Sequence, residues 1–168
     1  MKKLNVFLLA CVAFLMSLNV VTAQTPAQNK ETTKKILAAI DAGDLNTFSK
    51  YVSPSAKEHM PFPPGMPSGL SDFEMVKILI AGYHTGFPDS KTQVEHMVAE
   101  GDMVMIYSIY TGTNKGEFMG MPATNKSVRI EQVDIIRFDA SGKAVEHWAV
   151  IDQLTMLQQL GVIPAEGK

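Results

Sequence analysis

The sequence predicts a single α+β domain, because its helical patterns come first and its strand patterns come last. Apolar residues recur at helical spacing in residues 30–42, and Ser71 with Glu74 has the form of a capping box before a second amphipathic segment. Residues 91–152 instead carry strand-like runs, two pairs of which are joined by short turns. This order indicates helices laid against one face of a curved, mostly antiparallel sheet.

Each element has its own boundary signals. Gly43 ends the first helix, and Asp44 is placed to cap a short helix through Tyr51. Residues 53–70 contain five Pro and two Gly and are predicted to form a loop. Four strands are predicted at 91–99, 103–113, 127–138 and 144–152, and a last helix over 153–160 ends at Gly161.

The first 23 residues have the features of a secretory signal peptide. Lys2 and Lys3 precede an apolar run over residues 4–21, and small residues at Val21-Thr22-Ala23 suit cleavage before Gln24. We therefore expect the protein to be exported, to the periplasm or the exterior, and to be cleaved near Ala23-Gln24.

Two other interpretations of this segment remain open. The apolar run is long enough for a transmembrane anchor, although Ser17 and Asn19 interrupt it. Lipid attachment at Cys11 is the second alternative, because Leu8-Leu9-Ala10-Cys11 has a lipobox-like form.

The remaining chain, residues 24–168, has the size of one ordinary domain. We expect a flexible lead-in over 24–29 and a folded domain over 30–163. Loss of Cys11, the single cysteine, would exclude disulfides and thiolate metal sites. The mature chain would carry 13 basic and 17 acidic residues, which does not favour binding to nucleic acid.

A long connector separates the second and third predicted strands. Residues 111–126 contain three Gly and also Phe118, Met119 and Met121, whereas a simple hairpin needs only two to five connecting residues. A loop that carries apolar side chains usually folds over something, so an Ω-loop that covers the core is one interpretation.

This connector resembles the signature of the SnoaL-like polyketide cyclases, also called ester cyclases. Three further motifs match that family in the same order. They are Phe87-Pro88-Asp89, then Glu100-Gly101-Asp102-x-Val104, and then Glu146-x-Trp148-x-x-x-Asp152 followed by Gln159-Leu160-Gly161. The resemblance implies a cone-shaped α+β barrel, in which N-terminal helices and a curved sheet enclose a pocket. It also implies general acid/base chemistry on an apolar carbonyl compound, such as an aldol-type ring closure of a polyketide ester.

The resemblance assigns the acid/base role to Asp152 and a place in the pocket wall to Trp148. Both would lie on one face of the strand at 144–152, while Val145, His147 and Ile151 would lie on the outer face, where a second copy of the chain would bind. Burial would raise the pKa of Asp152 towards neutrality. The alternative is that Asp152 caps the helix over 153–160.

The resemblance also implies six further pocket residues. His59, in the Pro-rich loop, would lie at the pocket mouth and bind a substrate oxygen, whereas the alternative for such a residue is simple solvation. Asn114 stands where the family has His, and Tyr107 stands where it has Arg, so both depart from the family pattern. Apolar contacts would come from Phe118 and Met121, in the connector.

Phe87, in the Phe-Pro-Asp turn, would be a further apolar contact. No pair of His residues has the spacing of metal ligands, and we expect neither metal nor cofactor. The expected partners are a small apolar carbonyl-containing ligand and a second copy of the chain, with no nucleic acid and no membrane after signal removal. Two alternatives to a cyclase remain open. One is a non-catalytic binding module of the same fold, and the other is an isomerase or hydrolase of a small apolar substrate.

Overall fold

A computed structural model describes residues 24–164. The predicted signal peptide and the alternatives at Cys11 lie outside the described residues. In chain order the structure contains α1 (Pro26–Asp41), α2 (Leu45–Tyr51), β1 (Val52–Glu58), α3 (Asp72–Gly86), β2 (Lys91–Glu100), β3 (Met103–Thr113), β4 (Ser127–Phe138), β5 (Ala144–Ile151) and α4 (Gln153–Leu160). The predicted α+β class is confirmed.

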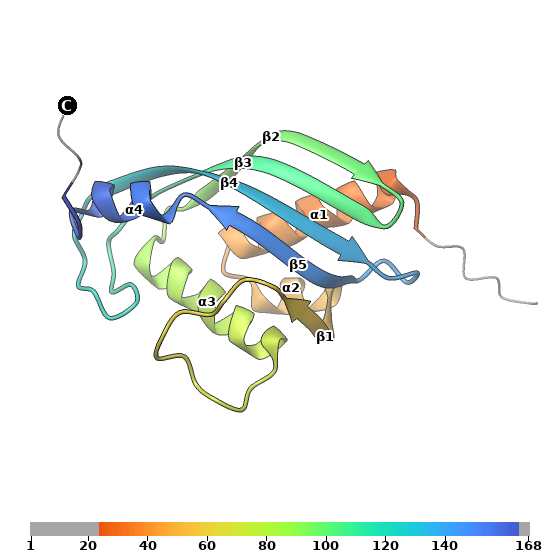
Figure 1. The fold of residues 1–168 in the computed structure, drawn as a ribbon, viewed down its shortest axis with the longest axis horizontal. Coiled ribbons are helices and arrows are strands. Elements are labelled where there is room, and N and C mark those ends of the chain that lie inside the picture. The colour runs from red at the N-terminus through yellow and green to blue at the C-terminus, as the bar shows by residue number, and fades with distance from the viewer. Residues whose placement is uncertain (1–23, 165–168) are drawn as a thin grey trace, which may run out of the picture.

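The five strands form one mixed sheet in the order β1-β5-β4-β3-β2. Strands β2 to β5 are the predicted antiparallel meander, whereas β1 pairs in parallel with β5. Helices α1, α2 and α3 lie on one side of this curved sheet, and α4 lies beyond the end of β5 (Figure 1). Strand β1 (Val52–Glu58) overlaps the segment predicted to be a loop, so that prediction is wrong for residues 53–58.

Helix α1 begins at Pro26, within the segment predicted to be a flexible lead-in. The Thr25 side chain accepts a hydrogen bond from the Gln28 backbone, and the Gln28 side chain accepts one from the Thr25 backbone. This capping box, together with Pro at the first helical position, starts the helix early. The predicted lead-in is therefore wrong for residues 26–29.

The apolar side chains form two clusters at opposite ends of the sheet. The first packs α1, α2 and α3 against the inner face, with Ile36, Phe73, Ile106 and Ile136 among its members. The second joins the end of α3 to α4 and the connector between β3 and β4. Phe118 of that connector is buried, so the connector does cover part of the core.

Within residues 24–164, no helix is both long and apolar enough to cross a membrane.

Candidate active site

A cavity of about 260 Å³ lies between the inner face of the sheet and the helices. Its walls are largely apolar. Helix α1 contributes Ile36, Leu37 and Ile40, helix α3 contributes Phe73, Val76 and Ile80, and the loop after β1 contributes residues 60–63. A concave, mostly apolar cavity with a few polar groups is the usual form of a small-molecule site.

Three ionisable side chains meet at one part of the cavity wall. His147 Nδ1 lies 2.7 Å from Glu58 Oε2, and His147 Nε2 lies 3.2 Å from Asp134 Oδ1. All three residues border the cavity. Asp134 is 8% exposed, and its second oxygen accepts a hydrogen bond from Gln132 Nε2 at 3.3 Å. The result is an imidazole held between two carboxylates in an apolar environment.

The sheet register brings this group together. Strands β4 and β5 pair Asp134 with Ala149 and Ile136 with His147, so Asp134 and His147 lie almost opposite each other on the inner face. Strand β1 pairs Glu58 with His147. The parallel strand β1, which the sequence patterns do not predict, therefore supplies one of the two carboxylates.

His147 carries a positive charge at neutral pH in this arrangement. Removal of water from around the ring lowers its pKa, but the hydrogen bonds and negative charges of Asp134 and Glu58 outweigh that effect and raise the pKa to about 9. An imidazolium between two carboxylates satisfies the rule that buried charges are paired.

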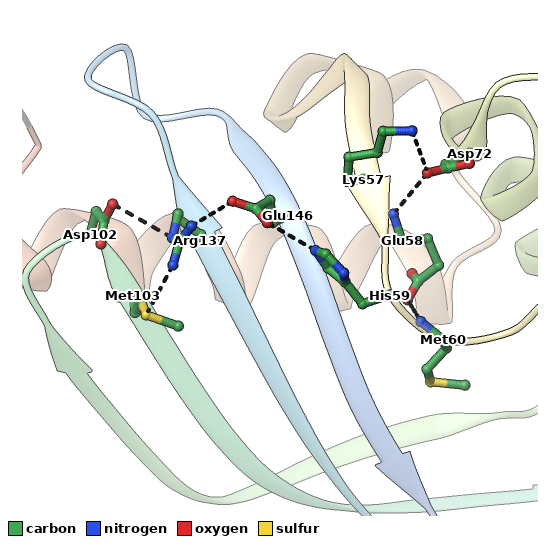
Figure 2. Close-up of polar contacts among 9 residues, drawn as sticks. All are labelled: Lys57, Glu58, His59, Met60, Asp72, Asp102, Met103, Arg137 and Glu146. Carbon is green, nitrogen blue, oxygen red and sulfur yellow. Dashed lines mark hydrogen bonds and ion pairs between the residues drawn. The ribbon is translucent and has the colours of Figure 1, made fainter.

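Glu58 also ties this group to the loop that follows β1. Its Oε1 accepts a hydrogen bond from the Met60 backbone N–H at 2.9 Å, and its own N–H donates to Asp72 Oδ2 at 3.2 Å. Figure 2 shows this run of contacts from Lys57 to Met60. The side chain that holds His147 thus also fixes the start of the loop that lines the cavity.

The expected position of Asp152 is wrong. Asp152 is exposed and does not border the cavity. Its Oδ1 accepts a hydrogen bond from the Thr155 N–H at 3.0 Å at the start of α4. Hydrogen bonds from Thr155 lower the pKa of this carboxyl, whereas a pocket base required a raised one. Asp152 is the helix cap that the sequence offered as the alternative.

Trp148 and His59 also lie away from the cavity, on the outer face of the sheet. Their rings stack with centroids 4.3 Å apart, and His59 Nε2 lies 2.9 Å from Glu146 Oε2. Arg137 lies over the Trp148 ring and pairs with Glu146. Figure 2 shows His59, Glu146 and Arg137 in one row that continues to Asp102. The expected pocket positions of both aromatic residues are therefore wrong.

The two faces of β5 are thus the reverse of those implied by the resemblance. His147 and Ile151, expected outside, border the cavity, and Trp148 faces out. A strand alternates its side chains between two faces, so an error of one residue moves every side chain to the other side. Both faces of β5 mix polar and apolar residues, and the pattern alone does not separate them.

The expected substrate contacts have structural roles instead. Phe87 and Phe118 are buried in the second apolar cluster with their ring centroids 5.1 Å apart, and Met121 packs against that cluster. Tyr107 lies on the outer face of β3, stacked with His96. None of these four residues borders the cavity in the part of the chain that the structure describes.

Asn114 is a buried anchor of the connector and does not border the cavity. Its Nδ2 donates to the carbonyls of Gly86 and Gly116, and its Oδ1 accepts from the Thr124 N–H. All the hydrogen bonds of this side chain are made with the backbone, at the end of α3 and within the connector. Asn114, which replaces the His of the family, therefore has a structural role.

We expect Asn114→Ala to destabilise the protein by about 2–4 kcal/mol, because it removes a buried side chain together with its hydrogen bonds to the backbone of Gly86, Gly116 and Thr124. Urea unfolding would measure this loss. Glu117→Ala is a control at an exposed position of the same connector, where we expect a change within about 0.5 kcal/mol. Equal effects of the two variants would contradict the anchoring role.

Sequence reasoning missed the group formed by Glu58, Asp134 and His147 in the cavity wall. Asp134 did carry a signal, since it is a single carboxylate inside the apolar run Val133-Asp134-Ile135-Ile136. A charge at such a position needs a partner when the strand is buried. The partners, Glu58 and His147, lie far away in the sequence and could not be assigned without the fold.

A model of the SnoaL-like polyketide cyclase family matches residues 30–160, most of the chain. The chain belongs to the SnoaL-like polyketide cyclase family. This confirms the resemblance, and the arrangement of four helices on a five-stranded mixed sheet within residues 24–164 fits the cone fold of this family. Among curated proteins, none matches the chain significantly.

Solved structures similar to this SnoaL-like protein carry different descriptions. AclR from Streptomyces galilaeus, described as a candidate hydroxylase, is 32% identical with a TM-score of 0.71, over 86% of this chain and 87% of AclR. IdmH from Streptomyces antibioticus, described as a candidate polyketide cyclase, is 31% identical with a TM-score of 0.69, over 80% of this chain and 99% of IdmH. TsrD from Streptomyces laurentii, 21% identical with a TM-score of 0.72 over 83% of this chain and 99% of TsrD, shares the fold.

Proposed function

We propose that this SnoaL-like protein performs general acid/base chemistry on an apolar carbonyl compound, with Asp134 as the base. The observation that carries the proposal is the Asp134 carboxylate, which is nearly buried, borders an apolar cavity and pairs with a charged His147. A carboxylate held in this way is suited to take a proton from the carbon next to a carbonyl group.

The reaction would proceed by proton transfer and rearrangement of one electron pair. Asp134 takes the α-proton, and the C–H electrons form an enolate. In a ring closure, the enolate carbon attacks a second carbonyl carbon of the same molecule, and the resulting alkoxide takes the proton back from Asp134. In an isomerisation, the proton returns to a different carbon. Both reactions conserve protons and electrons, and both need only a side chain that accepts and returns one proton.

His147 would support this chemistry through its charge. Both ring nitrogens are engaged, one with Glu58 and one with Asp134, so the ring fixes the orientation of the base. Its positive charge also stabilises negative charge that develops on the enolate nearby, and such an effect is strong where water is excluded.

Family membership alone does not choose the reaction. Two similar structures of nearly equal identity are described as a candidate hydroxylase and a candidate polyketide cyclase. The proposal therefore rests on the cavity and its charged group. It names a class of substrate, an apolar carbonyl compound, and no individual substrate. The volume of about 260 Å³ is slightly below the range of about 300–1,000 Å³ for drug-sized ligands, which favours a ligand of one or two rings.

Exchange of the α-protons of 2-tetralone in D₂O, followed by ¹H NMR, tests the proposal with a bicyclic ketone of suitable size. We expect the purified protein to accelerate exchange well above the buffer rate. Binding of 2-tetralone without acceleration would instead support the non-catalytic binding module. Absence of both would overturn the proposal that this cavity takes apolar ketones.

Homodimerisation stays a prediction. The outer face of the sheet carries exposed apolar side chains, including Val98 and Val150, which are 62% and 75% exposed. Exposed apolar area of this kind is typical of an interface. Native mass spectrometry of the purified protein would show whether two copies associate.

A further inference from the structure

The hydroxyl group of Tyr110 has no use in the chemistry described above. Tyr110 is 8% exposed and borders the cavity, and its Oη is buried without a hydrogen-bond partner within residues 24–164. Buried polar groups almost always have partners, so an exception calls for an explanation. A ligand that binds in the cavity would supply the partner.

Tyr110 and Asp134 lie on the same inner face of the sheet but far apart. Strands β3 and β4 pair Tyr110 with Ile130 and Ile106 with Asp134, so four residues separate the two positions along the strands. At about 3.3 Å per residue, the backbone positions are about 13 Å apart. Tyr110 therefore borders the end of the cavity that is remote from the charged group.

The surroundings of Tyr110 leave its hydroxyl proton free to donate. Asp41, a carboxylate that borders this end of the cavity, already accepts hydrogen bonds from the Thr92 backbone at 2.9 Å and from the Thr92 hydroxyl at 2.8 Å. Burial raises the pKa of Tyr110 and so keeps its hydroxyl protonated. Ser90, which also borders the cavity here, lies close enough to the Tyr110 oxygen to lower its pKa as a donor, an effect smaller than that of burial, and it leaves the Tyr110 proton free.

We propose that the Tyr110 hydroxyl binds an oxygen atom at the end of the substrate remote from the reacting carbon. The substrate class is then an elongated apolar ketone or ester with a hydroxyl or carbonyl oxygen at its far end. This inference rests on the proposed function, because it takes the cavity as the substrate site. Tyr110 would then select among carbonyl compounds, whereas Asp134 and His147 would react with them.

Equilibrium binding of two matched pairs of probes tests this subsite. One pair is 2-tetralone and 6-hydroxy-2-tetralone, and the longer pair is 4-acetylbiphenyl and 4-acetyl-4′-hydroxybiphenyl. We expect the hydroxylated member of at least one pair to bind the wild-type protein about tenfold more tightly, as one well-placed hydrogen bond in a dry site allows. Tyr110→Phe should remove that difference and leave the affinity for the other member unchanged.

Tyr107→Phe is the matched control, since Tyr107 lies three residues away on the outer face of the same strand. It should keep the preference for the hydroxylated probe. Thermal unfolding separates binding from a structural role. Because the Tyr110 hydroxyl makes no well-formed hydrogen bond within residues 24–164, and only approaches Ser90, Tyr110→Phe should change the melting temperature little.

Wild-type protein that does not prefer either hydroxylated probe, or Tyr110→Phe protein that keeps the preference, would overturn the subsite. A clear loss of thermal stability in Tyr110→Phe would also overturn it, since that loss would reveal an internal partner. Preference for a hydroxylated probe without α-proton exchange would leave the subsite standing and remove the proposed reaction.

Discussion

Replacing Asp134 with Asn is expected to slow α-proton exchange of 2-tetralone by about 10²–10⁴-fold, the usual contribution of one placed acid/base group. The amide keeps the shape of the carboxyl but accepts no proton at neutral pH. It can still accept a hydrogen bond from His147 Nε2, which lies 3.2 Å from Asp134 Oδ1. The variant should therefore fold, which far-ultraviolet circular dichroism would check.

Asp152→Asn is the matched control for this experiment. Asn caps a helix about as well as Asp, so the hydrogen bond from the Thr155 N–H survives and the fold should be unaffected. We expect exchange at the wild-type rate. Loss of exchange in Asp152→Asn with normal exchange in Asp134→Asn would restore the acid/base role that the family resemblance assigned to Asp152.

The second large effect is that the free energy of unfolding should depend on pH because His147 titrates. Its folded-state pKa of about 9 lies above the ordinary value of 6.5, so the folded protein binds a proton that the unfolded chain releases. The resulting stabilisation is fully present below pH 6.5 and is lost as the pH rises through 9. With allowance for solvent screening of the partly exposed ring, the loss should be on the order of 1–2 kcal/mol.

Urea unfolding at pH 6, 7.5 and 9 would measure this loss in the wild-type protein. His147→Gln removes the titrating ring, so its stability should change much less over the same range. His96→Gln is the control, because His96 is exposed on the outer strand β2 and should leave the wild-type slope intact. An equal slope in His147→Gln would contradict the charge assigned to the His147 ring.

Much of the fold follows from local signals. Asp44 caps α2 and Ser71 caps α3, as their side chains and spacing predict. The meander from β2 to β5 follows from strand-length runs separated by two short turns and one long connector. Strand β1 does not follow, because Pro54 and the neighbouring Ser residues are typical of a loop. It forms because β5 offers a free edge in the folded sheet, which is a tertiary effect.

The site could be predicted far less well than the fold. The family motifs identify the connector correctly, yet Asn114 and Phe118 there hold the fold together and lie outside the cavity lining. The charged group depends on the register of β1, β4 and β5, and a strand pattern with polar residues on both faces does not fix which face is inside. Asp134 alone was visible as a charge in an apolar strand.

The most direct test is an NMR titration of the His147 ring, followed through its carbon-bound protons from pH 5 to pH 10.5. A ring held between Glu58 and Asp134 should titrate with a pKa of about 9, well above an ordinary histidine, and Asp134→Asn should lower that value. A pKa at or below 6.5 in the wild-type protein would contradict the charged group in the cavity, and with it the base proposed for the reaction.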